Sequence, residues 1–426
     1  MDSNPKGNEG EYFVNTIANN IFLEYWCYPS PHDEKGDKKE ICDLLITFRD
    51  ILIIISVKNY DFKDNYDRYF NNTIEKALKQ IQGAEKKLFG NKEVFIKHPK
   101  KGLELFDKTR YSKVFRIIVN LGKGLKFYHP SSYTKSGKHV TIMDGTAWFA
   151  ITNEMNTIKD LTNYLTAREK LLSSKSVIML FCSDDEYDKE THEKFTERVA
   201  KTQSKNEKHI FISGSELDLL ATYINNSNSY PENLTSDNYA GLFYDIDGTW
   251  KNFISDPIFL KKKKKDQQSF FIDKFIENEI GYRKELKTLA EKLMSLNRFE
   301  RRIVSENFFS FYDKYKKGYE KQFARAFTDI SDFGFVFAKY PKELQGETLD
   351  NVLMLAIESF AVHTEYLRTD FIIIAYHDDF KGLRYNNFEL ANKFTEQEEK
   401  EIMADAKSLG WFSESFNYRK INEREY

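Results

Sequence analysis

The pattern of apolar and polar residues divides the first ninety or so residues into a helix, two strands and a second helix. Apolar residues at helical spacing predict a first helix over Gly10–Glu24. Two apolar runs rich in β-branched residues, Ile41–Phe48 and Ile51–Lys58, predict two strands. A polar stretch, Tyr60–Asn72, then separates the second strand from a strongly amphipathic helix predicted over Thr73–Phe89.

The two strands are predicted to form a hairpin whose turn is Arg49-Asp50. Centring the turn there places Asp43 directly opposite Ser56. Cross-strand partners share a face of the sheet, and so do residues two apart on one strand. We therefore expect Asp43, Ser56 and Lys58 on one face, at the same end of the hairpin.

The first helix adds a carboxylate to this group. Glu11 precedes Ala18, a member of the apolar stripe, by seven residues, which places it within ~20° of that position around the helix. Glu11 is therefore expected to point towards the edge of the buried face. Together with Asp43 it provides oxygen ligands of the kind that a hard cation prefers.

This order of elements resembles the PD-(D/E)XK nuclease superfamily over about a quarter of the chain. That family has a helix with a glutamate, a strand with an aspartate, a hairpin to a strand ending in (D/E)-x-Lys, and then an amphipathic helix. The resemblance implies a restriction-endonuclease-like mixed sheet flanked by helices and metal-dependent hydrolysis of phosphodiester bonds. It implies that Asp43 and Glu11 bind Mg²⁺ or Mn²⁺, that Lys58 positions the attacking water, and that Ser56 assists weakly.

The sequence departs from the family at the second acidic position, which is Ser56. A serine hydroxyl is a neutral, weak ligand, so Glu11 would have to supply the missing charge. Glu40 is a reserve, although its position on the predicted strand has the parity opposite to that of Asp43. The alternative is a binding or regulatory protein that uses a catalytically decayed nuclease fold.

The rest of the chain is predicted to be α/β and then α-rich, with domains over residues 1–150, 151–260 and 261–426. In the middle region a helix over Thr157–Leu172 begins with a capping-box variant. Strand Val177–Phe181 and a strand–turn–helix over His209–Ile224 follow it, and Pro231–Lys265 is expected to be rich in loops.

The C-terminal region is expected to begin with a long charged helical stretch over Arg283–Lys317. The elements predicted after it are strand Gly334–Ala338, helix Leu349–Tyr366, strand Phe371–Tyr376 and a helix near Thr395–Leu409. This region resembles parts of bacterial proteins with nuclease-like N-termini, which implies a role in antiviral defence against foreign DNA. A second copy of the chain or another protein is the partner expected for it.

A second enzyme class is suggested by Asp245-Ile-Asp-Gly-Thr249, which resembles the nucleophile motif of haloacid dehalogenase-type phosphatases. Asp245 would attack phosphate and Asp247 would act as acid and base, with Asp378-Asp379 as a downstream acidic pair. The residues before Asp245 are a poor candidate for a buried strand. An ordinary turn containing Asp and Gly is the favoured interpretation.

Several basic and aromatic residues are candidates for contacts with nucleic acid, each weighed against an ordinary structural role. Those within the nuclease-like part are best placed to line a substrate groove, while the lysine run near residue 263 and the polar side of the second helix are expected to be solvated. The basic candidates are Lys86, Lys87, Lys97–Lys101, Lys261–Lys265, Lys79 and Gln80, and the aromatic ones are Tyr60, Tyr66, Tyr69 and Phe70.

Composition narrows the class of protein without identifying it. The chain of 426 residues has a net charge of -2, which is mild evidence against a broad phosphate-binding surface but leaves room for a local basic track. Its three cysteines, Cys27, Cys42 and Cys182, are too far apart for a thiolate zinc site or a disulfide framework. The sequence lacks a signal-peptide pattern and a long apolar run, so we expect a cytoplasmic protein with a nucleic-acid partner, DNA before RNA, and no membrane partner.

Overall fold

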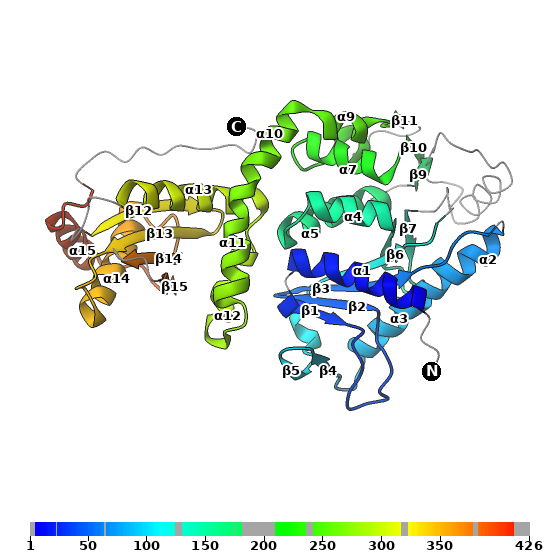
Figure 1. Cartoon of the computed structure of the whole chain (residues 1–426), viewed down its shortest axis with the longest axis horizontal. Coiled ribbons are helices and arrows are strands. Elements are labelled where there is room, and N and C mark those ends of the chain that lie inside the picture. The colour runs from blue at the N-terminus through cyan, green and yellow to red at the C-terminus, as the bar shows by residue number, and fades with distance from the viewer. Residues whose placement is uncertain are drawn as a thin grey trace. The chain divides into compact units, whose positions relative to one another are not determined.

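The computed structural model forms two compact units, residues 1–260 and 261–426 (Figure 1). The structure describes residues 5–22, 24–63, 65–123, 130–174, 176–180, 209–235, 242–316, 323–377 and 382–412. Cys182 and the acidic pair Asp378-Asp379 lie outside the described residues. The first unit contains both the predicted nuclease-like region and the predicted middle region.

The first unit is built on a six-stranded mixed sheet of described strands, with the order β1-β2-β3-β6-β8-β7. Strands β2 and β3 are antiparallel, whereas β3, β6 and β8 are parallel to one another. This confirms the prediction of an α/β fold with a mixed N-terminal sheet. The strands are β1 (Cys27–Pro29), β2 (Leu44–Phe48), β3 (Ile51–Lys58), β6 (Lys113–Asn120), β7 (Ser131–Tyr133) and β8 (His139–Asp144).

The hairpin of β2 and β3 has the predicted register. Phe48 pairs with Ile51, and Leu44 pairs with Ile55. The turn is tight because Arg49 adopts a left-handed conformation with φ of 49°. The predicted start of the first strand is wrong, however: β2 begins at Leu44, so Asp43 lies just before the strand and its side chain is free to turn towards the end of β3.

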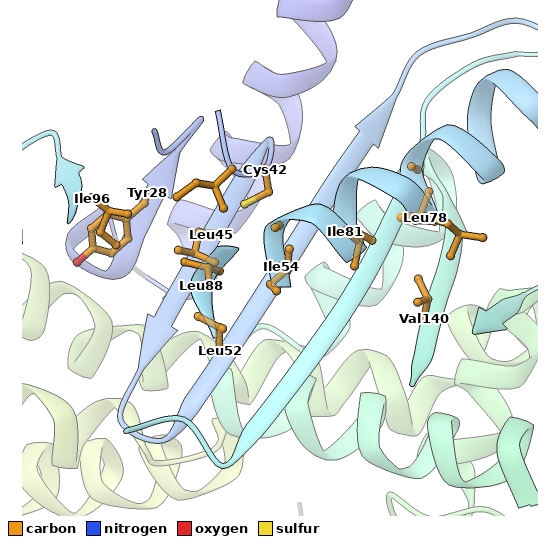
Figure 2. Packing of buried hydrophobic residues seen from close by; sticks show 14 of the residues in the cluster. Tyr28, Cys42, Leu45, Leu52, Ile54, Leu78, Ile81, Leu88, Ile96 and Val140 are labelled. Carbon is orange, nitrogen blue, oxygen red and sulfur yellow. The ribbon is translucent and has the colours of Figure 1, made fainter. Parts of the chain in front are cut away.

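Helices cover both faces of this sheet (Figure 1). Helix α1 (Pro5–Phe22) lies on one face, near α4 (Gly145–Glu154) and α5 (Ile158–Ser174), and α3 (Lys76–Leu88) lies on the other. Figure 2 shows the packing on the α3 side, where Leu78, Ile81 and Leu88 meet strand residues such as Leu45 and Ile54. Burial of this apolar surface holds α3 against the sheet, next to the strand β3 that carries Ser56 and Lys58.

The second helix begins earlier than predicted. The polar stretch Tyr60–Asn72, predicted to separate a strand from this helix, contains α2 (Tyr66–Phe70). A π-helical segment (Asn71–Glu75) joins α2 to α3. Asn65 starts α2 by accepting a hydrogen bond from the backbone N–H of Arg68 at 2.9 Å. The prediction failed because Tyr66 and Tyr69, which look polar in the sequence, are buried.

The middle region holds a three-stranded parallel sheet, with the order β11-β10-β9 among the described residues. The described part of Pro231–Lys265, a segment predicted to be rich in loops, is instead largely helical, and its lysine run lies in α10. The Asp256 carboxylate begins that helix by accepting a hydrogen bond from the backbone N–H of Ile258 at 2.8 Å. The elements are β9 (Ser176–Leu180), β10 (His209–Ser213), α7 (Glu216–Asn225), α8 (Glu232–Thr235), β11 (Leu242–Asp245), α9 (Thr249–Ser255) and α10 (Pro257–Asp266).

A buried ion pair joins α5 to α7. The guanidinium of Arg168 and the carboxylate of Glu216 form two hydrogen bonds, of 2.6 and 2.8 Å, and the side chains are 0% and 2% exposed. The hydroxyl of Tyr164 donates a third hydrogen bond to the carboxylate, at 3.0 Å. This pair fixes the middle region to the helices that cover the large sheet.

The second unit is an α/β structure around a four-stranded sheet, with the order β12-β13-β14-β15 among the described residues. The charged helical stretch predicted over Arg283–Lys317 contains two successive α-helices among its described residues, because Asn297 forms a capping box with Glu300 and starts the second one. The elements are α11 (Phe270–Phe275), α12 (Lys287–Met294), α13 (Arg298–Tyr315), β12 (Ala324–Ile330), β13 (Phe333–Tyr340), α14 (Gly346–His363), β14 (Asp370–His377), β15 (Arg384–Glu389) and α15 (Glu396–Ser408). In the part of the chain that the structure describes, no helix has the length and apolar character needed to cross a bilayer.

Candidate active site

Asp43, Ser56 and Lys58 lie together at one end of the hairpin, as the register predicts. The carboxylate of Asp43 accepts a hydrogen bond from the backbone N–H of Val57 at 2.6 Å and lies 3.7 Å from the ammonium of Lys58. The ammonium donates to the hydroxyl of Ser56 at 2.9 Å. These side chains are largely shielded from water, with Lys58 15% and Asp43 9% exposed.

Gln80 of α3 connects the three residues. Its amide nitrogen donates to Asp43 at 3.0 Å, and its amide oxygen accepts from Ser56 and from Lys58, each at 2.8 Å. The chemistry of the partners fixes the orientation of the amide, since a carboxylate only accepts and an ammonium only donates. Gln80 thus lies beside the position where the family has its second acidic residue.

The interpretation of Gln80 as part of a solvated helix face is wrong. Gln80 is half-buried, whereas its neighbour Lys79 is exposed as predicted. A signal was present in the sequence: Gln80 follows Ala77 by three residues and precedes Ala84 by four, and both alanines are buried. Residues at these spacings share a helix face, so Gln80 lies on the edge of the buried face.

Lys58 is held in place at all three of its donor positions. Besides Ser56 and Gln80, its ammonium donates to the carbonyl of Val57 at 2.9 Å. Burial lowers the pKa of Lys58, the negative charge of Asp43 opposes that change, and the pKa remains below its ordinary value. A lysine in this state is better suited to exchange a proton with water than an exposed one.

Glu11 reaches the same end of the sheet from the opposite face. Its helix packs closely there, since a Cβ on Gly10 would lie 3.6 Å from Val57. The Glu11 carboxylate accepts a hydrogen bond from the hydroxyl of Ser30 at 3.3 Å. Burial and the negative charge of Asp43 raise the pKa of Glu11. The structure therefore brings Glu11 into the electrostatic field of Asp43, as the helical phase predicts.

Glu40 also lies within this field. Strand β2 begins at Leu44, so strand parity says nothing about the direction of the Glu40 side chain. Glu40 instead forms an isolated β-bridge with His32. Partial burial raises the pKa of Glu40, and the charges of Asp43 and Glu11 raise it further. A cation near these carboxylates would relieve their mutual repulsion.

The donor set fits a hard cation that keeps much of its water. Among the described residues, no group of three or more His, Cys, Asp and Glu side chains is arranged to hold a metal ion. Mg²⁺ is commonly bound through one or two carboxylates, together with waters and substrate phosphate. Asp43 and Glu11 are the residues that would hold it, because each carboxylate accepts few hydrogen bonds and both face the same end of the sheet.

The segment Lys97–Lys101, expected to line a substrate groove, is largely occupied by structural contacts. Buried His98 accepts hydrogen bonds from the backbone N–H groups of Lys100 and Lys101 at 3.0 and 3.1 Å. Lys100 pairs with Glu24 at 2.6 Å, and Lys101 pairs with Glu104 at 3.3 Å. These contacts anchor the small hairpin of β4 (Phe95–His98) and β5 (Gly102–Leu105).

The other candidates divide between the core and the surface. Tyr66 and Tyr69 are buried, and Tyr69 accepts a hydrogen bond from Asn120, so these two rings cover the edge of the core. Tyr60 and Phe70 are half-buried. Lys87 pairs with Asp37 at 2.5 Å, while Lys86 is exposed.

The phosphatase-like motif forms a local turn at the end of an edge strand. The residues before Asp245 form a strand, but Phe243 in it is 64% exposed, so it is not the buried strand that the phosphatase motif would follow. Asp245 accepts a hydrogen bond from the backbone N–H of Asp247 at 3.2 Å, and both carboxylates are exposed. Gly248 completes the turn with φ of 75°. These contacts are those of the ordinary Asp–Gly turn.

Comparisons of the chain with models of protein families, with curated proteins and with solved structures find no match. The resemblance to the PD-(D/E)XK superfamily therefore stays a prediction.

Proposed function

We propose that this protein is a metal-dependent nuclease that hydrolyses phosphodiester bonds, with DNA as the expected substrate. The observation that carries the proposal is the meeting of Asp43, Lys58 and Gln80 at one end of a hairpin, with Glu11 and Glu40 in the same electrostatic field. An isolated ion pair on a hairpin would consist of Asp43 and Lys58 alone. Here α3, α1 and the segment before β2 each add a side chain near that pair.

Each residue has a definite role in this proposal. A Mg²⁺ or Mn²⁺ ion held by Asp43 and Glu11 would supply positive charge next to the phosphate and lower the pKa of a water bound to it. Lys58 would exchange one of its three hydrogen bonds for one to the attacking water, orient that water and exchange a proton with it, helped by its lowered pKa. Gln80 and Ser56 position the Lys58 ammonium through the hydrogen bonds described above.

Metal dependence is the direct test of this function. We expect the protein to cut at least one of plasmid DNA, linear duplex DNA, single-stranded DNA and RNA when Mg²⁺ or Mn²⁺ is present. Chelation by EDTA should abolish the cutting, and excess Mg²⁺ should restore it. Product formation on gels measures the result. Cutting that persists in EDTA, or no cutting of any of the four substrates, would contradict the proposal.

The second candidate is a nucleic-acid-binding or regulatory protein on the same fold without catalysis, and Ser56 favours it. The hydroxyl of Ser56 already hydrogen-bonds to both Lys58 and Gln80, so it has little capacity left to bind a cation. In this case nucleic-acid affinity would be independent of divalent metal and would survive Lys58→Ala.

Ser56→Asp distinguishes the two candidates. An added carboxylate next to Asp43 increases the negative charge of the site, so we expect at least about a 10-fold lower Mn²⁺ concentration for half-maximal cutting, equivalent to ~1.4 kcal/mol. Ser56→Ala is the matched control, because it removes the hydroxyl without adding charge. If wild type is inactive and Ser56→Asp gains metal-dependent cutting, the natural protein is the decayed form. If Ser56→Asp leaves the metal dependence unchanged, the cation does not bind at this site.

A further inference from the structure

A basic groove lies on the other flank of α3 from the candidate active site. It has a volume of about 440 Å³ and is open to solvent. One wall is the C-terminal part of α3 and the residues after it, and the other is the turn between β7 and β8. The lining residues are Gln82, Glu85, Lys86, Phe89, Gly90, Lys135, Ser136 and Lys138.

The one carboxylate that lines the groove is already neutralised. Arg116 of β6 donates two hydrogen bonds to Glu85, at 2.6 and 3.0 Å, and Lys138 donates a third at 2.9 Å. Burial alone would raise the pKa of Glu85, but these cations outweigh it and lower the pKa. Glu85 therefore remains ionised, and its negative charge is balanced by Arg116 and Lys138.

Lys86 and Lys135 are left without an acidic partner. Both are exposed, and within the described part of the chain neither forms an ion pair. Together with Lys138 they make three lysines against one carboxylate among the lining residues, so the groove carries an excess of positive charge. Exposed lysines of this kind attract anions at a range set by ionic strength.

The walls of the groove are held in a fixed shape. In the β7–β8 turn the backbone N–H of Thr134 donates to the carbonyl of Lys138 at 2.8 Å, and Gly137 adopts φ of 76°. On the other wall, a Cβ on Gly90 would lie 2.7 Å from the carbonyl oxygen of Lys86, so only glycine allows this close turn. Lysines presented from a rigid groove lose less entropy when a ligand binds.

We propose that this groove binds the phosphate backbone of the nucleic acid on which the candidate active site acts. The inference rests on the proposed function for its ligand. The charges are lysine ammonium groups, which contact phosphates as point charges, and the neutral polar side chains are Gln82 and Ser136. Contacts of this type position a nucleic acid without reading its sequence.

The groove shares a helix with the candidate active site. Gln80 and Lys86 are six residues apart on α3, a rise of about 9 Å along the helix axis. The groove is therefore separate from the residues that would perform hydrolysis, and a nucleic acid that crosses α3 would contact both. This makes Lys86 and Lys135 positioning residues that determine affinity.

The test compares wild type with the double variant Lys86→Gln/Lys135→Gln in binding to fluorescently labelled DNA, measured by anisotropy in EDTA over a series of salt concentrations. We expect affinity to fall by about 10-fold or more at low salt, whatever the DNA sequence, and the slope of log affinity against log salt to fall by about 2. The matched control is Lys113→Gln/Lys170→Gln, which removes the same charge from two exposed lysines that do not line the groove. Circular dichroism confirms that both variants are folded.

Three outcomes would overturn the groove proposal: wild-type affinity in the groove variant, an equal loss in the control variant, or no binding of DNA by wild type. Direct binding of inorganic phosphate, measured at matched ionic strength, identifies the source of the phosphate. If inorganic phosphate binds wild type but not the groove variant, while DNA binds both equally, the groove binds free phosphate and the backbone assignment is wrong. Binding without metal is independent of cutting, so loss of affinity in the groove variant supports the groove even if the nuclease proposal fails.

Discussion

Replacing Lys58 by alanine is expected to reduce the rate of metal-dependent cutting by about 10²–10⁴-fold, the usual contribution of a positioned proton-transfer group. The ammonium has three acceptors, Ser56, Val57 and Gln80, and lies 3.7 Å from the carboxylate of Asp43. Alanine removes this charge and the group that would exchange one of these hydrogen bonds for one to the attacking water. Single-turnover cutting at saturating metal measures the chemical step directly.

Asp43→Ala is expected to cause a loss at least as large, because it removes a proposed metal ligand and the acceptor of hydrogen bonds from Val57 and Gln80. Excess Mn²⁺ should rescue Asp43→Ala in part but should not rescue Lys58→Ala. Lys79→Ala, which removes an exposed lysine from the same helix as Gln80, is the control and should stay within about 3-fold of wild type. Wild-type rates in Lys58→Ala would show that catalysis occurs elsewhere.

Replacing Glu216 by alanine is expected to destabilise the first unit by about 3–5 kcal/mol. The guanidinium of Arg168 is fully buried, and its two hydrogen bonds to Glu216 neutralise it. Alanine leaves that charge in the core without a counterion, and it also removes the acceptor for the Tyr164 hydroxyl. The cost of an unpaired buried charge is much greater than the net contribution of the pair itself.

Urea denaturation followed by tryptophan fluorescence measures this effect in the first unit, since Trp26, Trp148 and Trp250 lie there and only Trp411 lies in the second. The double variant Arg168→Met/Glu216→Leu removes both charges and should recover most of the lost stability. The control is Lys100→Ala in the same unit, which breaks a pair with Glu24 whose side chains are 47% and 45% exposed. That variant should change stability by less than about 1 kcal/mol. A loss of under ~1 kcal/mol in Glu216→Ala would refute the buried-charge argument.

The features that local sequence determines were predicted correctly. The hairpin register follows from two apolar runs and a two-residue turn, and the pairing of Phe48 with Ile51 confirms it. The start of α5 follows from Thr157, whose hydroxyl accepts a hydrogen bond from the backbone N–H of Asp160 at 3.1 Å. The phase of α1 likewise placed Glu11 near Asp43. Each depends on residues close in sequence, where spacing alone fixes geometry.

The features that tertiary contacts determine were missed or were wrong. Tyr66 and Tyr69 extend the second helix because the core buries them, and β15, whose sequence is largely polar, is a strand because Asp370–Ala375 of β14 pair with it. The lysine run near residue 263 looked like a solvated loop, yet it continues a helix that begins at Pro257. In each case a neighbour distant in sequence, or a cap outside the apolar pattern, outweighed local composition.

The candidate site divides in the same way. The sequence by itself determined that Asp43, Ser56 and Lys58 lie at one end of a hairpin, because the register of β2 and β3 brings the residue before Leu44 next to the end of β3. Only the tertiary structure decided that Gln80 fills the space between them and that Glu40 joins their electrostatic field. The packing of α3 against β3 fixes the position of Gln80, and the path of the chain before β2 fixes the position of Glu40. Neither position is set by local spacing.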